Sequence, residues 1–465
     1  MNRYQQLAEQ IKQQIEQNTW RAGEKVLSIR AASKSYLVSA STVLQAYQLL
    51  ESEGWLTAKP QSGYFVTPTL MRKQNAAATA TPTVAYNDRL YQFLKRGNCA
   101  KVALGSAFPA PDLFPLTVLN RHLASAGRKL PAQQVLHNLP PGNESLRRSI
   151  AQRYIMSGLN VSHRDIVLTS GAMEALNLSL ATLCKPGDKV VLESPTFYGA
   201  LQAVERLGLE AIMVPVDPQT GLCVTTFEQV LERHKVKACW LMSRYQNPTG
   251  ACLSETDKQQ VVKLAHQYDV TIIEDDVYAE LGLSDSMLHP FKYYDQHDRV
   301  MLCGSFSKSL CPGYRIGWVV NQTLSDQLQK QQMLSTLSAS APIQHGIAHY
   351  LQHESFDNHL RKLRKTLAQR SDAMLQLLEQ HLPKQSQVHV SPGGYFVWVE
   401  FAKQVDCYQV YHSLLEKGIS VADGGLFGPS SQFNHCLRIN VSFAIDSAVE
   451  QAVVKIGQLV QRYTA

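Results

Sequence analysis

The stretch GSFSKSLCPGYRIGW, residues 304–318, is the most specific motif from which the fold of this chain can be predicted. It places Lys308 between the hydroxyl residues Ser305 and Ser307, and Arg315 follows after a short turn. Lysines in loops are usually solvated, but apolar surroundings and a nearby cation both lower the pKa of an amine. A lysine that loses its proton readily, beside hydroxyls and a guanidinium, suits a Schiff base with a phosphorylated aldehyde. The stretch therefore predicts that pyridoxal 5'-phosphate (PLP) binds at Lys308.

A helix that can hold the phosphate of this cofactor is expected in TSGAMEAL, residues 169–176. Gly171 lies there between a predicted strand and a predicted helix, and the amides of Ala172 and Met173 open the helix. Helix N-termini bind anions through unpaired N–H groups and through the helix dipole. Glycine between a strand and a helix is common, so this motif alone is weak evidence for a phosphate site. It supports such a site only together with the motif around Lys308.

A carboxylate for the pyridine nitrogen is expected in VTIIEDDVYAEL, residues 270–281. Its three acidic residues end an apolar strand, where the functional side chains of α/β sheets gather. PLP acts as an electron sink when its ring nitrogen is protonated, and a buried carboxylate maintains that proton. We assign this role to Asp275. The alternative is that Glu274, Asp275 and Asp276 only cap the next helix, which is plausible for two of the three.

Two further segments supply side chains for the cofactor ring. RYQNPTGACLS, residues 244–254, offers Asn247 as a donor to the phenolic oxygen, with Tyr278 as a second donor. Asn-Pro pairs usually form only a turn. In ESPTFYGA, Phe197 can stack on the ring and Tyr198 is its rival, although aromatic residues at strand ends more often belong to a core.

Outward from this site, apolar strand patterns alternate with amphipathic helix patterns, as in DIVLTSG followed by AMEALNLSLATL. This alternation predicts βα units and a mainly parallel central sheet with helices on both faces. We expect the domain to span residues 89–465, with a large lobe over about 120–330 and a smaller α+β C-terminal lobe mainly over about 331–465. Residues 69–88, rich in Ala, Thr and Pro, predict a linker before it.

Residues 1–68 have a different organisation. Apolar residues at helical spacing predict three helices, over residues 4–18, 29–36 and 39–54. Ser39 or Ser41 can cap the third helix. The following WLTAKPQSGYFVTP alternates like two strands around a turn. This order predicts a winged helix-turn-helix domain, and the alternative is a generic helical cap with a hairpin.

Composition sets the remaining limits. The 465 residues are 45% hydrophobic and 18% charged, as in a globular protein. They contain no apolar run of the roughly 18 residues that a membrane span needs, so we expect a cytoplasmic protein without membrane contacts. The nine cysteines include no Cys-x-x-Cys pair, which predicts neither a disulfide framework nor a metal site. The net charge of +7 permits nucleic-acid binding without demanding it.

Together these motifs resemble the MocR subfamily of the GntR transcriptional regulators, in which a GntR-type winged helix precedes a fold-type-I, aspartate-aminotransferase-like domain. The resemblance covers nearly the whole chain and rests on PGNESLR, TSGAMEA, ESPTFYG, NPTG, EDDVY, SFSKSLCPGYRIGW and LRINVS, in this order. It implies an α/β fold with PLP as an internal aldimine on Lys308. It also implies that Arg438 clamps a substrate carboxylate and that the loop 105–115 borders the substrate site. With Phe197 from the segment ESPTFYGA, the candidate cofactor-binding residues are Ala172, Met173, Phe197, Asn247, Asp275, Tyr278, Ser305, Ser307, Lys308 and Arg315.

The head departs from the GntR pattern in two places. The pattern has Leu-Pro-Ser before the second helix and a basic residue after the first serine of the recognition helix, where this chain has Val26-Leu27-Ser28 and Ser39-Ala40-Ser41. Loss of the basic side chain removes one phosphate or base-edge contact, so we expect modest DNA affinity for each head. The remaining candidates for DNA contact are Arg30, Ser39, Ser41, Thr42, Gln45, Tyr47, Lys59, Gln61 and Ser62.

We predict a PLP-dependent transcriptional regulator. A homodimer would bind double-stranded operator DNA through its heads and sense an amino acid or another amino compound through Lys308. The alternative is a genuine aminotransferase that moves an amino group from an amino acid to a 2-oxo acid, because the residues for this chemistry are present. A PLP-binding scaffold without catalysis is the third hypothesis. Slow or partial transamination is expected even in a regulator.

Overall fold

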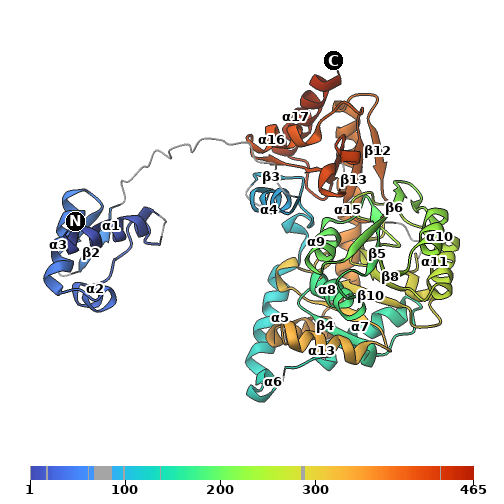
Figure 1. Ribbon diagram of the computed structural model, residues 1–465, viewed down its shortest axis with the longest axis horizontal. Helices are drawn as coiled ribbons and strands as arrows, with labels where there is room; N and C mark the ends of the chain where they lie inside the picture. The colour runs from blue at the N-terminus through green and yellow to red at the C-terminus, as the bar shows by residue number, and fades with distance from the viewer. Residues whose placement is uncertain are drawn as a thin grey trace. The chain divides into compact units, whose positions relative to one another are not determined.

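The computed structural model describes residues 2–16, 19–60, 62–67, 86–97, 100–136, 138–283, 288–429 and 431–464 (Figure 1). The chain divides into two compact units, Met1–Thr83 and Val84–Ala465. Each unit has its own hydrophobic core. None of the helices within these described ranges is long and apolar enough to cross a membrane.

The described residues of the smaller unit form three helices and a hairpin. They are α1 (Arg3–Glu16), α2 (Ile29–Tyr36), α3 (Ala40–Ser52), β1 (Leu56–Lys59) and β2 (Gly63–Val66). Ser28 caps α2 and Ser39 caps α3, each by accepting a hydrogen bond from an amide of the first turn. The helices and the hairpin share one core, which includes Ile11, Val43 and Leu50. The predicted winged helix-turn-helix is confirmed.

The described part of the larger unit contains a sheet of eight strands in the order β4-β11-β10-β9-β8-β5-β6-β7. The strands are β4 (Ile166–Thr169), β5 (Lys189–Ser194), β6 (Glu210–Asp217), β7 (Gly221–Leu222), β8 (Val236–Leu241), β9 (Thr271–Asp275), β10 (Val300–Ser305) and β11 (Gly317–Val320). Neighbours from β10 to β6 run parallel, whereas β11 is antiparallel to β4 and β10, and β7 is antiparallel to β6. The mainly parallel sheet is confirmed. Side chains that follow β5, β8, β9 and β10 therefore share its carboxyl edge.

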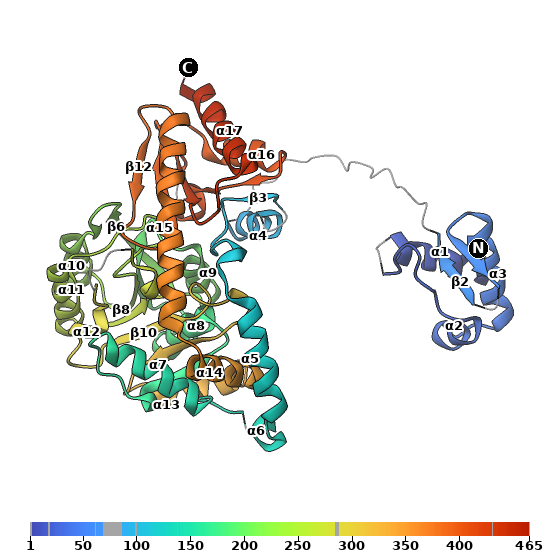
Figure 2. The ribbon, with the colours of Figure 1, turned by 180° about the vertical axis from the view of Figure 1, so that it is seen from behind.

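Helices cover both faces of this sheet (Figure 1 and Figure 2). One core joins α8 (Ala172–Leu183), α9 (Tyr198–Arg206) and α13 (Ser325–Ser335), and the other joins α10 (Val224–Arg233), α11 (Glu255–Gln267) and α12 (Phe291–Tyr294). Val190 of β5 belongs to the first core and Val191 to the second, because successive side chains of a strand point to opposite faces. A further layer consists of α5 (Leu116–Lys129), α6 (Ala132–Leu136), α7 (Glu144–Met156) and α14 (Ala341–His353), which pack together.

The smaller lobe is built around the antiparallel sheet β12-β13-β16-β15. Its elements are β12 (Gln387–Val390), β13 (Phe396–Glu400), α16 (Cys407–Leu415), β14 (Ile419–Ser420), β15 (Ala422–Asp423), β16 (Cys436–Asn440) and α17 (Ser447–Thr464). Two early elements join it, α4 (Tyr86–Gly97) and β3 (Val102–Ala103). Leu90 and Phe93 of α4 pack in its core, and β3 pairs with β14.

The boundary between the lobes differs from the predicted one near residue 331. Both α13 and α14 pack against the large lobe. The long helix α15 (Phe356–His381) contributes Leu363 to the large-lobe core and Met374 and Leu378 to the small-lobe core. The small lobe therefore begins within α15 and also recruits α4 and β3. An amphipathic pattern reveals that a helix has a buried face but not which neighbour covers it, which explains the difference.

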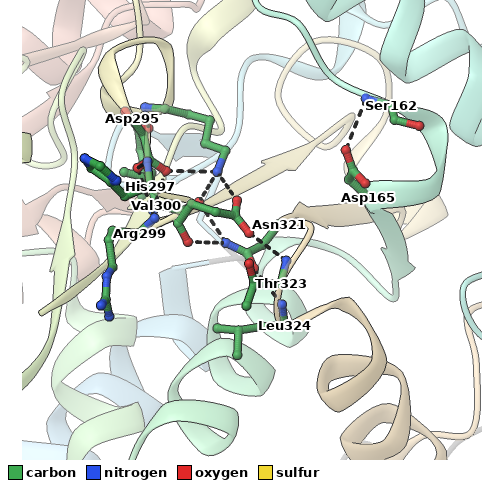
Figure 3. Close-up of polar contacts among 12 residues, drawn as sticks. Ser162, Asp165, Asp295, His297, Arg299, Val300, Asn321, Thr323 and Leu324 are labelled. Carbon is green, nitrogen blue, oxygen red and sulfur yellow. Dashed lines mark hydrogen bonds and ion pairs between the residues drawn. The ribbon is translucent and has the colours of Figure 1, made fainter. Parts of the chain in front are cut away.

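A polar cluster closes the amino end of β10 (Figure 3). Lys292 donates to Asp295, Asp298 and the carbonyl of Val300, at 3.0, 2.6 and 2.9 Å. Asp295 also accepts three backbone amides of the loop that leads into β10. Asn321, directly after β11, donates to the same Val300 carbonyl at 3.2 Å. The cluster fixes β10 and β11 at the edge opposite to the carboxyl ends of the parallel strands.

Candidate functional site

A cavity of about 290 Å³ opens at the carboxyl edge of the large-lobe sheet. Its lining includes all ten residues that the sequence analysis assigned to the cofactor: Ala172, Met173, Phe197, Asn247, Asp275, Tyr278, Ser305, Ser307, Lys308 and Arg315. They come from the ends of β9 and β10 and from the segments that follow β4, β5, β8, β9 and β10. The topology of the sheet thus brings distant parts of the chain to one cavity.

Lys308 follows β10 and is half-buried in this cavity. Its Nζ donates to the carbonyl of Ala107 at 2.5 Å and lies 4.1 Å from the ring centre of Phe108. Burial and, to a lesser extent, the positive charge of Arg438 lower the pKa of Lys308 to about 7, against the opposing charge of Asp275. A large part of the amine is therefore uncharged near neutral pH, which is the form that attacks a carbonyl carbon.

The three successive carboxylates at the end of β9 have different environments. Asp276 accepts two hydrogen bonds of 2.7 Å from Arg244. Glu274 accepts from the first two amides of α12, at 2.7 and 3.1 Å. Asp275, in contrast, has a buried Oδ1 without a hydrogen-bond partner in the described part of the chain, and burial raises the pKa of Asp275 to about 7. Of the three, Asp275 is the carboxylate that keeps an atom available to a ligand.

Another part of the cavity wall suits an anion. α8 begins at Ala172 behind Gly171, which has a φ of 91° and no side chain with which to cap the helix. Arg315 lies against this turn, since a Cβ at Gly171 would be 2.5 Å from Arg315 Nη2. Ser305 Oγ accepts the amide of Ser307 at 2.9 Å, and Ser307 Oγ is buried with no partner among the described residues. Amides, hydroxyls and a guanidinium together fit a phosphate group.

Asn247 and Tyr278 meet at the cavity wall, where Asn247 Nδ2 donates to Tyr278 Oη at 3.3 Å. Phe197 and its rival Tyr198 both line the cavity, with ring centres 4.5 Å apart. Tyr198 is buried in the small-lobe core, whereas Phe197 is half-buried. More of the Phe197 ring is therefore free to contact a ligand.

Arg438 is buried on β16 between the rings of Phe396 and Phe427, at 4.2 and 5.1 Å from their centres. It does not belong to the cavity lining, but it contacts two residues that do. Its Nη1 donates to Asn247 Oδ1 and its Nη2 to the carbonyl of Gly105, both at 2.8 Å. Its Nε is buried and has no partner in the described ranges. A guanidinium with an open N–H beside the cavity suits a carboxylate.

The structure adds cavity residues that the motifs did not reveal. Phe93 and Leu94 reach the cavity from α4. Tyr395 Oη donates to the carbonyl of Ala107 at 2.9 Å, so this carbonyl accepts from both Tyr395 and Lys308. The family resemblance indicated the loop that begins at Gly105. Nothing in the local sequence distinguishes Phe93 and Leu94 from residues of an ordinary amphipathic helix.

On the head, most of the predicted DNA-contact residues lie at the surface. Arg30, Ser39, Ser41, Gln45, Lys59 and Ser62 are exposed, Thr42 is half-buried, and Gln61 lies outside the described residues. The assignment of Tyr47 to DNA contact is corrected: its side chain is 1% exposed and its hydroxyl donates to the carbonyl of Leu27 at 2.7 Å. Because Tyr47 lies one turn from Val43 on the inner face of α3, it supports the core of the head.

Comparisons with known proteins match both parts of the chain. Residues 116–456 match the family of class I and II aminotransferases, and residues 3–66 match the gntR family of bacterial regulatory proteins. The chain is 42% identical to YdcR and 33% identical to YjiR, two uncharacterized HTH-type transcriptional regulators of Escherichia coli, over 99% of both chains in each case. Among solved structures, the kynurenine aminotransferase of Pyrococcus horikoshii matches with a TM-score of 0.74 and 27% identity, covering 80% of this chain and 94% of that chain.

Proposed function

This chain belongs to the class I and II aminotransferase family and carries a gntR-family head, which is the MocR-type architecture, and from this premise we propose that it is a transcriptional regulator whose larger domain binds PLP and senses an amino compound. The observation that carries the proposal is a cavity with unpartnered buried polar atoms in a chain that also has a DNA-binding head. Relatives that align along the whole chain are named as regulators, which favours this function over the aminotransferase alternative. Regulation of transcription also implies a cytoplasmic location.

The cavity fits PLP by its charges and by its unpartnered atoms. A buried carboxylate oxygen without a partner is costly, so the open Oδ1 of Asp275 suits a protonated ring nitrogen. The uncapped start of α8, with Ser307 Oγ and Arg315, would hold the phosphate. Asn247 and Tyr278 would hold the phenolic oxygen. When bound, PLP supplies an electron sink for bonds at the α-carbon of an amino compound.

The residues around the cofactor site suit an amino acid as the sensed compound. Asn247 and the carbonyl of Gly105 hold the two Nη groups of Arg438, so its open Nε would donate to a carboxylate in one orientation. Lys308, with a pKa of about 7, can give up its proton and accept another near neutral pH. Arg438 would thus select the carboxylate and Lys308 would exchange protons with the amine.

The head supplies the surface for DNA. Arg30 at the start of α2 and Lys59 at the end of β1 are exposed cations that suit phosphates, while Ser41 and Gln45 are exposed on α3 and suit base edges. The two heads of a homodimer would bind two half-sites of one operator. For regulation, the liganded and unliganded states of the larger domain must differ in DNA affinity. By linkage, DNA then changes the affinity for the ligand by the same factor.

The test is DNA binding by the full-length protein. Binding is measured to DNA from upstream of its own gene, with and without PLP and at two salt concentrations, and Lys308→Ala serves as the matched variant. We expect specific binding that weakens steeply with salt, because phosphate contacts release counterions. PLP should change the affinity of the wild type more than that of Lys308→Ala. Binding no tighter than to random DNA, or equal responses of the two proteins, would contradict the proposal.

A further inference from the structure

The charged side chains that line the cavity are few. Within the described residues they are Asp275, Lys308 and Arg315. Under the proposed function all three serve the cofactor, at its ring nitrogen, its aldehyde and its phosphate. Arg438, which contacts the cavity through Asn247 and Gly105, serves the α-carboxylate of the ligand. Among the described lining residues no charge is then left for the ligand's own side chain.

The rest of the wall includes a group of apolar side chains: Phe93 and Leu94 of α4, Phe108 and Tyr198. Phe93 and Tyr198 are buried and fixed by an edge-to-face contact, with ring centres 6.5 Å apart. Leu94 and Phe108, in contrast, keep 40% and 37% of their surface exposed. Large exposed apolar side chains at a concave site are typical of a surface that binds an apolar group.

Phe108 brings this apolar wall next to the reactive amine. Its ring centre lies 4.1 Å from Lys308 Nζ, and its backbone carbonyl accepts from Asn440 Nδ2 at 2.7 Å. Gly105, three residues earlier on the same segment, contacts Arg438. An amino acid with its nitrogen at Lys308 and its carboxylate at Arg438 would therefore extend its side chain along the apolar wall.

We propose that the sensed ligand is an amino acid with an apolar or aromatic side chain. This inference rests on the proposed function and names the class of compound that the same site takes. Transfer of an apolar ligand side chain from water to the surface formed by Phe93, Leu94 and Phe108 is favourable. A side-chain carboxylate or ammonium at the same place loses its hydration without gaining a partner. Dicarboxylic and dibasic amino acids therefore bind weakly.

The test uses the full-length, PLP-loaded protein. L-phenylalanine, L-leucine, L-glutamate and L-lysine are titrated separately while the absorbance of the bound cofactor is recorded. We expect L-phenylalanine and L-leucine to saturate the change at concentrations at least tenfold below those that L-glutamate and L-lysine require. L-glutamate acting at an equal or lower concentration overturns the inference and leaves the proposed function intact. If none of the four changes the absorbance, the inference is likewise overturned, and the DNA-binding test decides separately whether the proposed function stands.

The variant Leu94→Arg tests whether Leu94 contacts the side chain of the ligand. This position of α4 is exposed and therefore accepts a longer side chain. A cation there supplies the missing partner for a side-chain carboxylate, so the affinity for L-glutamate relative to L-phenylalanine should rise at least tenfold. Leu94→Gln has a polar side chain without the charge and is the matched control, in which the wild-type order of ligands persists. An unchanged order in Leu94→Arg would overturn the assignment of Leu94 to the ligand wall.

Discussion

The two ends of strand β10 carry similar side chains and differ in how completely these are bonded. At the amino end, Lys292 donates to Asp295, Asp298 and a backbone carbonyl. At the carboxyl end, Lys308 shares a cavity with Asp275, yet the hydrogen bond that it makes within the described residues is to a backbone carbonyl. A lysine near aspartates therefore does not mark a functional site by itself. Unpartnered buried atoms that line one cavity, as Asp275 Oδ1 and Ser307 Oγ do, are the stronger sign, because folding rarely leaves them without a reason.

The charge states of the aspartates follow the same division. Burial opposes ionisation of Asp298, but the hydrogen bond from Lys292 outweighs it together with other contacts, and the pKa of Asp298 is lowered. Burial raises the pKa of Asp275 to about 7, because the charge of Lys308 compensates only in part. Asp298 therefore stays charged, whereas Asp275 and Lys308 can exchange protons near neutral pH. The amino end of β10 thus stabilises the fold and the carboxyl end remains available for chemistry.

The largest expected effect is the loss of covalently held cofactor in Lys308→Ala. We expect the absorption band of the lysine-bound cofactor to disappear completely, because alanine has no amine to bind the aldehyde. Absorption spectra are recorded after incubation with PLP and gel filtration. Lys292→Ala, which removes the lysine at the other end of the strand, should keep the band. An unchanged spectrum in Lys308→Ala would contradict the distinction between the two ends.

The next largest expected effect is on stability, for which the amino end of β10 should matter more than the carboxyl end. Lys292→Met should lower the free energy of unfolding by about 3–5 kcal/mol, because it removes the cation that Asp295 and Asp298 share. The side chain of Asp295 is 1% exposed and that of Asp298 is 21% exposed. Urea denaturation of the cofactor-free protein gives the measurement. Lys308→Met, the matched variant, should cost much less, and equal losses in the two variants would show that both lysines are structural.

The smallest expected effect is a dependence on pH. Since Lys308 is protonated below its pKa of about 7 and reacts when neutral, the rate of PLP capture should rise about tenfold per pH unit below pH 7 and level off above it. Stopped-flow absorbance measures this rate. Asp275→Asn removes a negative charge that raises the pKa of Lys308, so the midpoint should move to lower pH. A midpoint near the ordinary pKa of lysine would mean that burial has no such effect.

Several parts of the candidate site were predictable because their signals are local. Asp275 ends β9, Gly171 and Asn247 lie in the segments that follow β4 and β8, and the rules of parallel sheets place the carboxyl ends of such strands together. The error at Tyr47 was avoidable on the same grounds. It lies four residues after Val43 and three before Leu50, on the face that helical periodicity assigns to the core. A hydroxyl group on a buried face is satisfied internally, here by the carbonyl of Leu27.

Other parts had no local signal. In the sequence, Leu94 is not distinguishable from any other residue of an amphipathic helix. Its place in the cavity depends on the packing of α4 on the small lobe. The lobe boundary within α15 likewise depends on which core covers each half of a continuous helix. Such contacts join residues far apart in the chain, and periodicity carries no information about the partner.

The amino-acid sequence by itself determined the order of the elements, the two-part organisation and the residues that we propose for cofactor binding, because capping, strand alternation and loop motifs act over a few residues. The tertiary structure alone decided that Lys308 meets the carbonyl of Ala107, that Arg438 meets Asn247, and that Asp275 keeps an open oxygen while Asp276 does not. These are differences in burial and in the number of partners, and both are set by the packing of segments that approach one another only in the folded chain.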